Sequence, residues 1–178
     1  DRVFLDAAMT NAAMAAGYGA RGVFTYFVNE LRVGTNRTPY SFVSSDLSDL
    51  SDLSDLSDLS DDSINISPWL ADDLGATPGD ALALSYFVLG PLRTLVETSA
   101  LFRVHLVKAL EGDSTPDFPG LSSADNCRDW KPGIPVDLKR IRPKDEDYWR
   151  QQGSTPKAAV SLATAQRLWA NQYGALTS

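Results

Sequence analysis

The sequence has very little of what most catalytic and metal sites are made from. Its 178 residues include one cysteine, Cys127, and one histidine, His105. One cysteine excludes an internal disulfide, and one residue of each type is too few for a zinc site with three or four His or Cys ligands. The patterns of a serine nucleophile (G-x-S-x-G and S-x-x-K) and of a P-loop are absent as well. No motif ties Cys127 to His105, so a structural role is favoured over a catalytic pair.

Acidic residues are the remaining candidates for chemistry, and they follow no known pattern either. Four aspartates lie close enough in sequence to suggest a site for a hard cation, but their order matches no known loop: Asp113, Asp117, Asp125 and Asp129. Asp145 and Asp147 lie among five basic residues, which favours local ion pairing over general acid–base catalysis. We therefore predict no catalytic residue, no cofactor, no metal and a protein that is not an enzyme.

An excess of basic residues is also lacking. The net charge is −7, but seven aspartates fall within residues 45–62, and the rest of the chain has 16 acidic residues against 16 Lys and Arg. This balance gives no basis for a nucleic-acid partner. No run of 18 apolar residues occurs, so no membrane span is predicted within the sequence.

Residues 45–59 are five copies of Ser-Asp-Leu. A period of three fits neither the 3.6 of a helix nor the 2 of a strand, so the leucines do not gather on one face. The run is typical of a solvated loop or disordered insert. The alternative is a helical segment whose leucines are covered by a partner.

The most regular stretch is residues 64–87, INISPWLADDLGATPGDALALSYF. Alternating apolar residues predict a strand at its start, and Ser67 followed by Pro68 predicts the cap and first turn of a short helix. Gly75 is placed to end that helix in the left-handed conformation, and a second alternating run begins at Ala81. The pattern predicts a strand–helix–strand unit that is part of the folded core.

Other patterns predict short elements around this unit: strands at 2–5, 23–33, 40–43, 99–110 and 157–162, helices at 7–16 and 163–172, and a hairpin that begins at Gly90-Pro91. Strand 23–33 has consecutive apolar residues in its first half, which predicts burial on both faces. The chain starts within one predicted strand and stops where another is expected, so we expect a longer protein around it. The chain divides into residues 1–43, a repeat segment at 44–63, and a main part at 64–178, within one domain.

Residues 111–157 are rich in proline, glycine and charge, which predicts sparse regular structure. A short helix is expected at 136–141 and another helical turn at 145–151. Long irregular segments in compact domains are often functional. The aromatic residues of the segment either anchor it to the core or, together with two arginines, present a surface to a partner or ligand: Phe118, Trp130, Arg140, Arg142, Tyr148 and Trp149.

The order of these units from Ile64 onward resembles the extracytoplasmic core domain of FtsX-like and MacB-like ABC transporter permeases. The resemblance rests on residues 64–87, on the F-x-V-x-x-V pattern of residues 102–107, and on the closing AAVSLATAQRLW of residues 158–169. Three further stretches resemble a large subgroup of these permeases: residues 23–43, 117–149 and 155–169.

The resemblance implies an α+β fold of the MacB-like periplasmic core type, with a mixed sheet, a few short helices and a long irregular segment. It also implies a position on the extracytoplasmic (periplasmic) side of a bacterial membrane. The partners it implies are the flanking transmembrane helices, a cytoplasmic ATPase subunit and an extracytoplasmic substrate or partner protein. The Ser-Asp-Leu run departs from the family pattern, in which an ordinary loop is expected.

Three hypotheses follow for function. The first is a non-enzymatic permease domain that couples ATP-driven movement to an extracytoplasmic substrate or partner protein. The second is a ligand- or glycan-binding module that uses the 113–150 segment. The third is a hydrolase that uses Asp145 and Asp147, for which the sequence offers no specific support.

Overall fold

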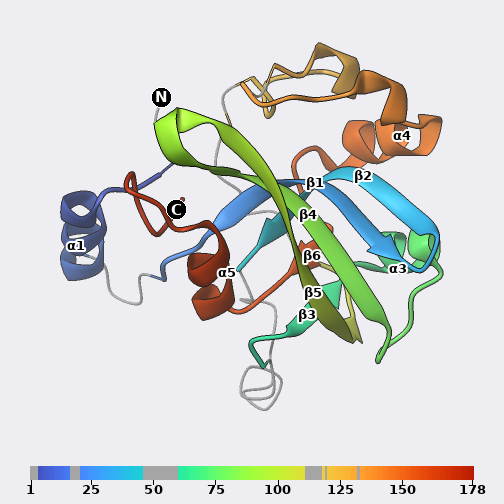
Figure 1. Ribbon diagram of the computed structural model, residues 1–178, viewed down its shortest axis with the longest axis horizontal. Coiled ribbons are helices and arrows are strands. Elements are labelled where there is room, and N and C mark those ends of the chain that lie inside the picture. Colours follow the sequence, from blue (N-terminus) through green and yellow to red (C-terminus); the bar gives the residue numbers. More distant parts are fainter. Residues whose placement is uncertain (1–3, 17–20, 46–59, 111–117, 119, 132) are drawn as a thin grey trace.

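Six strands close into a mixed β-barrel in the computed structural model, which describes residues 4–16, 21–45, 60–110, 118, 120–131 and 133–178. The order around the barrel is β1-β2-β6-β3-β5-β4 (Figure 1). The strands are β1 Thr25–Val33, β2 Asn36–Ser44, β3 Ser63–Ile66, β4 Ala81–Leu89, β5 Leu95–Val107 and β6 Ala158–Ala159. The helices are α1 Ala7–Ala16, α3 Pro68–Leu74, α4 Pro143–Gln152 and α5 Leu162–Trp169, and short 3-10 turns span Pro91–Arg93, Cys127–Asp129 and Leu138–Arg140.

The prediction of an α+β fold of the MacB-like core type was wrong, because the sheet closes on itself and the helices are few and short. Closure depends on β6, which pairs in parallel with β2 and antiparallel with β3. Ala158 lies opposite both Val43 and Ile66. Two alanines are too few to show an alternation of apolar and polar residues. The sequence pattern of residues 157–162 therefore predicted a strand, but not that this strand closes a barrel.

The unit at residues 64–87 was predicted correctly. Ser67 Oγ accepts a hydrogen bond from the Leu70 N–H at 3.2 Å, and Pro68 occupies the first turn of α3. Gly75 ends the helix at φ 62°, in the left-handed region where glycine is favoured. In sequence α3 connects β3 to β4, and in the fold it packs next to β2.

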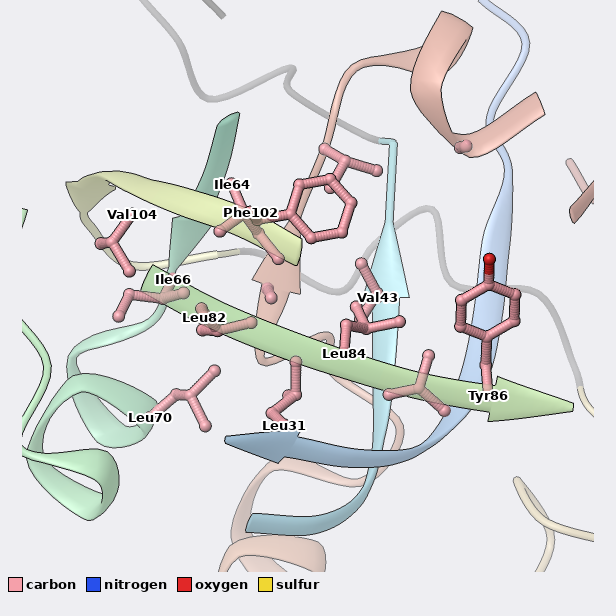
Figure 2. Close-up of a cluster of buried hydrophobic side chains, with 14 of the residues drawn as sticks. Leu31, Val43, Ile64, Ile66, Leu70, Leu82, Leu84, Tyr86, Phe102 and Val104 are labelled. Carbon is pink, nitrogen blue, oxygen red and sulfur yellow. The ribbon is translucent and has the colours of Figure 1, made fainter. Parts of the chain in front are cut away.

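The interior of the barrel is filled by aliphatic side chains from every long strand and from α3 (Figure 2). Leu31 and Val43 come from β1 and β2, Leu82 and Leu84 from β4, and Leu70 from α3. All five are buried. Each buried leucine contributes about 1.5–3 kcal/mol through the hydrophobic effect, so this cluster is the main source of stability.

Strand β1 is buried on both faces, as its consecutive apolar residues predicted. Phe24 and Val28, before and within the strand, belong to the interior cluster. Phe27 belongs to a second cluster on the outer face, which is covered by the segment after residue 117. The irregular segment is therefore packed onto the barrel, with α4 and two 3-10 turns as its regular parts.

The two ends of the described chain lie side by side. The Leu5 N–H donates to the Leu176 carbonyl at 2.9 Å, and the Val23 N–H donates to the Ser178 carbonyl at 2.7 Å. Gly22 is in such close contact with Leu176 that a Cβ there would lie 2.6 Å from its Cδ1 atom. Residues near the two ends of the sequence therefore lie together beside the start of β1.

Other predicted elements differ in their bounds. Helix 7–16 is present as α1, whereas the helix predicted at 163–172 begins at Leu162 and ends at Trp169. The strand predicted at 2–5 has one described bridge, at Leu5, and its residues 2 and 3 lie outside the described residues. Most of the Ser-Asp-Leu run, residues 46–59, lies outside them too. The helix that the sequence predicted at 136–141 is a single 3-10 turn.

Candidate functional site

The segment that holds the sequence-predicted site residues forms a clamp over the outer face of β1 and β2; the clamp is residues 118, 120–131 and 133–153. Phe42 of β2 contacts Phe118 at 4.7 Å between ring centroids, and Phe27 of β1 meets Trp130 edge to face at 5.6 Å. Trp130 in turn packs against Trp149 at 4.9 Å. These aromatic contacts join the clamp to the barrel in a second hydrophobic cluster.

The four aromatic residues predicted as either anchors or a surface are all buried: Phe118, Trp130, Tyr148 and Trp149. Three of them belong to the second cluster, and Tyr148 packs instead against Trp69 of α3 at 4.9 Å. The Trp149 indole N–H donates to the Ala124 carbonyl at 2.8 Å. In this structure the rings anchor the clamp, and their use as a binding surface stays a prediction.

The two predicted arginines also hold the clamp. Arg140 donates to Glu30 of β1 and lies 5.3 Å above the Tyr40 ring. Arg142 forms a two-bond contact with Asp145, with N–O distances of 2.7 Å, and reaches Asp73 of α3 at 2.6 Å. The clamp is therefore tied to the barrel by charge as well as by aromatic packing.

Asp73 is the centre of this charged network. Its side chain is buried and accepts hydrogen bonds from Thr38, Arg142 and Lys144. Burial opposes ionisation of the carboxyl, but these hydrogen bonds outweigh burial and keep its pKa below the ordinary value. The network joins β2, α3 and α4, so the relative positions of these elements depend on one carboxylate.

Lys157 lies beside the clamp, against aromatic rings of α3 and α4, and sequence reasoning missed it. Its Nζ atom is 4.1 Å from the Trp69 ring centroid and 4.5 Å from that of Tyr148, so the ammonium group lies between two aromatic faces. Burial lowers its pKa to about 8, while the charge of Asp145 acts in the opposite direction. A small cavity of about 20 Å³ adjoins Lys157 and Asp145, which is room for about one water molecule.

Cys127 is not placed for nucleophilic chemistry. Its thiol is buried in the second cluster, and burial, with the nearby charge of Glu146, raises its pKa to about 12. The thiol therefore stays protonated at neutral pH, when only the thiolate is reactive. His105 is on β5, outside the clamp.

Of the six carboxylates considered for a cation or for hydrolysis, Asp125 is an exposed residue of the clamp, and the other five are engaged elsewhere or lie outside the described residues. Asp113 and Asp117 are outside them, and Asp129 accepts a hydrogen bond from Asn126 at 2.5 Å. Asp145 and Asp147 pair with Arg142 and Arg150, as the sequence predicted. Within the described ranges, no group of three or more His, Cys, Asp or Glu is arranged to hold a metal ion.

An apolar cavity of about 530 Å³ opens between the clamp, the β4–β5 hairpin and the end of α5. Phe87 and Leu95 line it from the hairpin, Tyr26 from β1 and Trp169 from α5, while Leu121 and Ile134 form the clamp side. Its volume falls in the range of about 300–1,000 Å³ that is typical of small-molecule sites. Sequence reasoning did not find this cavity, because its walls come from four separate parts of the chain.

Comparison with known proteins does not add to this description: no protein-family model matches the chain, and no curated protein matches it. In the part of the chain that the structure describes, no helix is both long and apolar enough to cross a membrane.

Proposed function

We propose that the chain is a non-enzymatic extracytoplasmic domain of a bacterial ABC transporter permease. The domain couples ATP-driven movement on the far side of the membrane to an extracytoplasmic substrate or partner protein. The observation that carries the proposal is the likeness of residues 23–43, 117–149 and 155–169 to stretches of these permeases. The proposal rests on this likeness in sequence. It does not extend to a MacB-like fold, because the chain folds as a barrel.

The three stretches are far apart in sequence but form one body. Residues 23–43 supply β1 and most of β2, residues 117–149 supply most of the clamp, and residues 155–169 supply β6 and α5. The Lys157 N–H donates to the Phe42 carbonyl at 3.0 Å, and Trp149 packs on Phe42 with 6.5 Å between ring centroids. The three stretches that carry the likeness therefore belong to one packed unit.

Residues near the two ends of the sequence lie together in the fold. Leu5 and Leu176 pair through a backbone hydrogen bond, and Thr177 and Ser178 bond to Val23. The proposal accommodates flanking segments that approach the barrel beside β1.

The clamp suits a domain that transmits movement. Aromatic packing, the Arg140–Glu30 pair and the Asp73 network fix residues 118–153 to the barrel from three directions. Packed elements of this kind move together instead of deforming continuously. A displacement of the barrel would thus carry the clamp with it.

The gene on either side of this sequence tests the proposal. We expect a run of about 20 apolar residues soon after Ser178, and another before residue 1, since this length spans the hydrocarbon core. An ATPase gene is expected nearby. A stop codon directly after Ser178, or flanking sequence without such runs, would contradict the proposal.

A second candidate function is the binding of an apolar small molecule in the cavity of about 530 Å³. The specific observation is that the clamp provides one wall of it, through Phe118, Leu121 and Ile134. The residues first considered for this role, Trp130, Tyr148 and Trp149, do not line this cavity.

Binding of a fluorescent fatty-acid analogue tests the second function. Leu95 lines the cavity and Leu101 lies on the same strand outside it, so Leu95→Asp and Leu101→Asp form a matched pair. If the cavity is used, only Leu95→Asp should weaken binding. Equal affinities for the wild type and both variants would rule the cavity out.

A further inference from the structure

The tip of the β4–β5 hairpin exposes a group of apolar side chains. The two strands pair from Ala81↔Arg103 to Leu89↔Leu95 and extend past the barrel (Figure 1). The exposed large apolar residues at this end are Leu89, Leu92, Leu95 and Val96. Leu92 is the extreme case, at 97% exposed. None of the four belongs to a core cluster, and Leu92 and Val96, unlike Leu89 and Leu95, do not line the cavity of about 530 Å³ either.

The backbone of Leu92 adds to this observation. Its φ of 55° and ψ of 25° lie in the left-handed region, which glycine and asparagine adopt far more readily than leucine. A leucine here is therefore unfavourable both in backbone conformation and in exposure to water. The backbone conformation and the exposure of Leu92 both lower the stability of the folded chain, and its side chain fills no space in the core. This combination indicates a role in contact with something other than the folded chain itself.

We propose that this hairpin tip inserts its apolar side chains into the surface of a lipid bilayer. The tip lies on the side of the barrel where the chain ends meet. Leu89 and Leu95 line the same cavity as Phe4, and the next residue, Leu5, pairs with Leu176. The inference rests on the proposed function in one respect: a permease domain would have a bilayer beside its chain ends.

Hydrogen bonds within the turn lower the cost of moving part of its backbone out of water. The Gly90 N–H donates to the Thr94 carbonyl at 2.7 Å, and the Thr94 N–H and hydroxyl both donate to the Pro91 carbonyl. Pro91 has no N–H to satisfy. Backbone groups that are paired within the turn can enter an apolar medium at lower cost than unpaired ones.

Size favours a bilayer over a second copy of the chain. Four side chains at one turn fall well short of the roughly 20–30 residues a side of a stable protein interface. Insertion at the boundary of headgroups and acyl chains requires no matching surface.

Flotation of the 178-residue chain with vesicles of phosphatidylcholine and phosphatidylglycerol tests the proposal. The critical variant is Leu92→Asn, because asparagine accepts the left-handed conformation and the variant should fold as well as the wild type. Leu101→Asn is the control, since Leu101 is 68% exposed on β5 but lies away from the tip. We expect Leu92→Asn to weaken vesicle partitioning about tenfold and Leu101→Asn to leave it unchanged.

The proposal is overturned if the wild type does not float at any lipid concentration, or if both variants weaken binding equally. It is also overturned if Leu92→Asn alters only self-association of the free protein in sedimentation, which would assign the tip to a contact between copies. The proposed function is tested separately by the flanking gene sequence. If the flanking sequence encodes membrane spans but the chain does not bind vesicles, only the inference about the hairpin is overturned. If the chain binds vesicles but no spans are encoded, only the proposed permease function is overturned.

Discussion

Replacing Lys157 by methionine should change how the stability of the protein depends on pH. Lys157 is buried, with Nζ 4.1 Å from the Trp69 ring centroid and 4.5 Å from that of Tyr148. Methionine has nearly the same length and no charge, so Lys157→Met removes the titrating group and preserves most of the packing. The comparison of the two proteins isolates the contribution of this one amine.

The sign follows from proton binding. The pKa of Lys157 is lowered from 10.5 to about 8 in the folded chain, mainly by burial. Between these values the unfolded chain binds more protons than the folded chain, so rising pH stabilises the wild type. At about 1.4 kcal/mol for each pH unit, the wild-type free energy of unfolding should gain about 3 kcal/mol relative to Lys157→Met across this window. Below pH 8 the difference between the two proteins should be constant.

Urea unfolding, followed by circular dichroism at several pH values from 7 to 10.5, measures this difference. Tyr26, whose pKa burial raises to about 12, destabilises both proteins at alkaline pH and cancels in the comparison. Cys127 cancels only in part, because the charge of Lys157 lowers a pKa that burial raises to about 12. Lys139→Met, at an exposed site, is the control and should change stability by no more than about 0.5 kcal/mol. A wild-type minus Lys157→Met difference that stays flat from pH 7 to 10.5 would refute the reasoning.

The remaining predictions concern the charged network, a helix cap and the core, and urea unfolding checks each of them. Asp73→Asn should lower the free energy of unfolding by about 1–3 kcal/mol at pH 7. The loss should be much smaller below the lowered pKa of Asp73, where the wild-type carboxyl is itself protonated. An equal loss for Asp147→Asn, at an exposed pair, would contradict this prediction. Ser67→Ala should cost about 1 kcal/mol through loss of the cap on α3, and no loss would mean that the cap is not needed. Leu70→Ala, at a fully buried site, should cost about 2–5 kcal/mol, and a loss below about 1 kcal/mol would show that the barrel interior relaxes around it.

The parts of the fold that depend on neighbours in sequence were predictable. Ser67, Pro68 and Gly75 fix the start and end of α3 by their own hydrogen-bonding and backbone preferences, and the structure confirms them. The hairpin at Gly90-Pro91 was expected for the same reason, although β5 begins earlier than predicted, at Leu95. Local chemistry is sufficient for elements of this kind.

Closure of the barrel was not predictable, because it depends on pairing between distant segments. β6 is only Ala158–Ala159, yet it joins β2 to β3. Two residues cannot show a periodicity, and no local sequence feature indicates that β3 pairs in parallel with β5. An α+β sheet and a closed mixed barrel therefore have nearly the same sequence pattern here.

Part of the clamp could be recognised in the sequence, whereas its use as a binding surface stays a prediction. Trp130 and Trp149 stood out as aromatic residues in an irregular segment, and whether they face the core or solvent required the structure. Lys157 gave no signal, since a lysine at the start of a predicted strand is ordinarily exposed. Leu92 did leave a trace, as an apolar residue directly after Gly90-Pro91 in a turn, where a polar residue or glycine is usual.

Surface labelling in cells tests the extracytoplasmic position of the domain most directly. In the protein expressed from its full-length gene, Ser123→Cys places a thiol at an exposed site of the clamp, and the buried Cys127, with its pKa raised to about 12, gives little background. A maleimide that cannot cross the cytoplasmic membrane should label Ser123→Cys in spheroplasts more strongly than the wild type. Labelling of Ser123→Cys only after the membrane is broken would place the domain on the cytoplasmic side and contradict the proposed function.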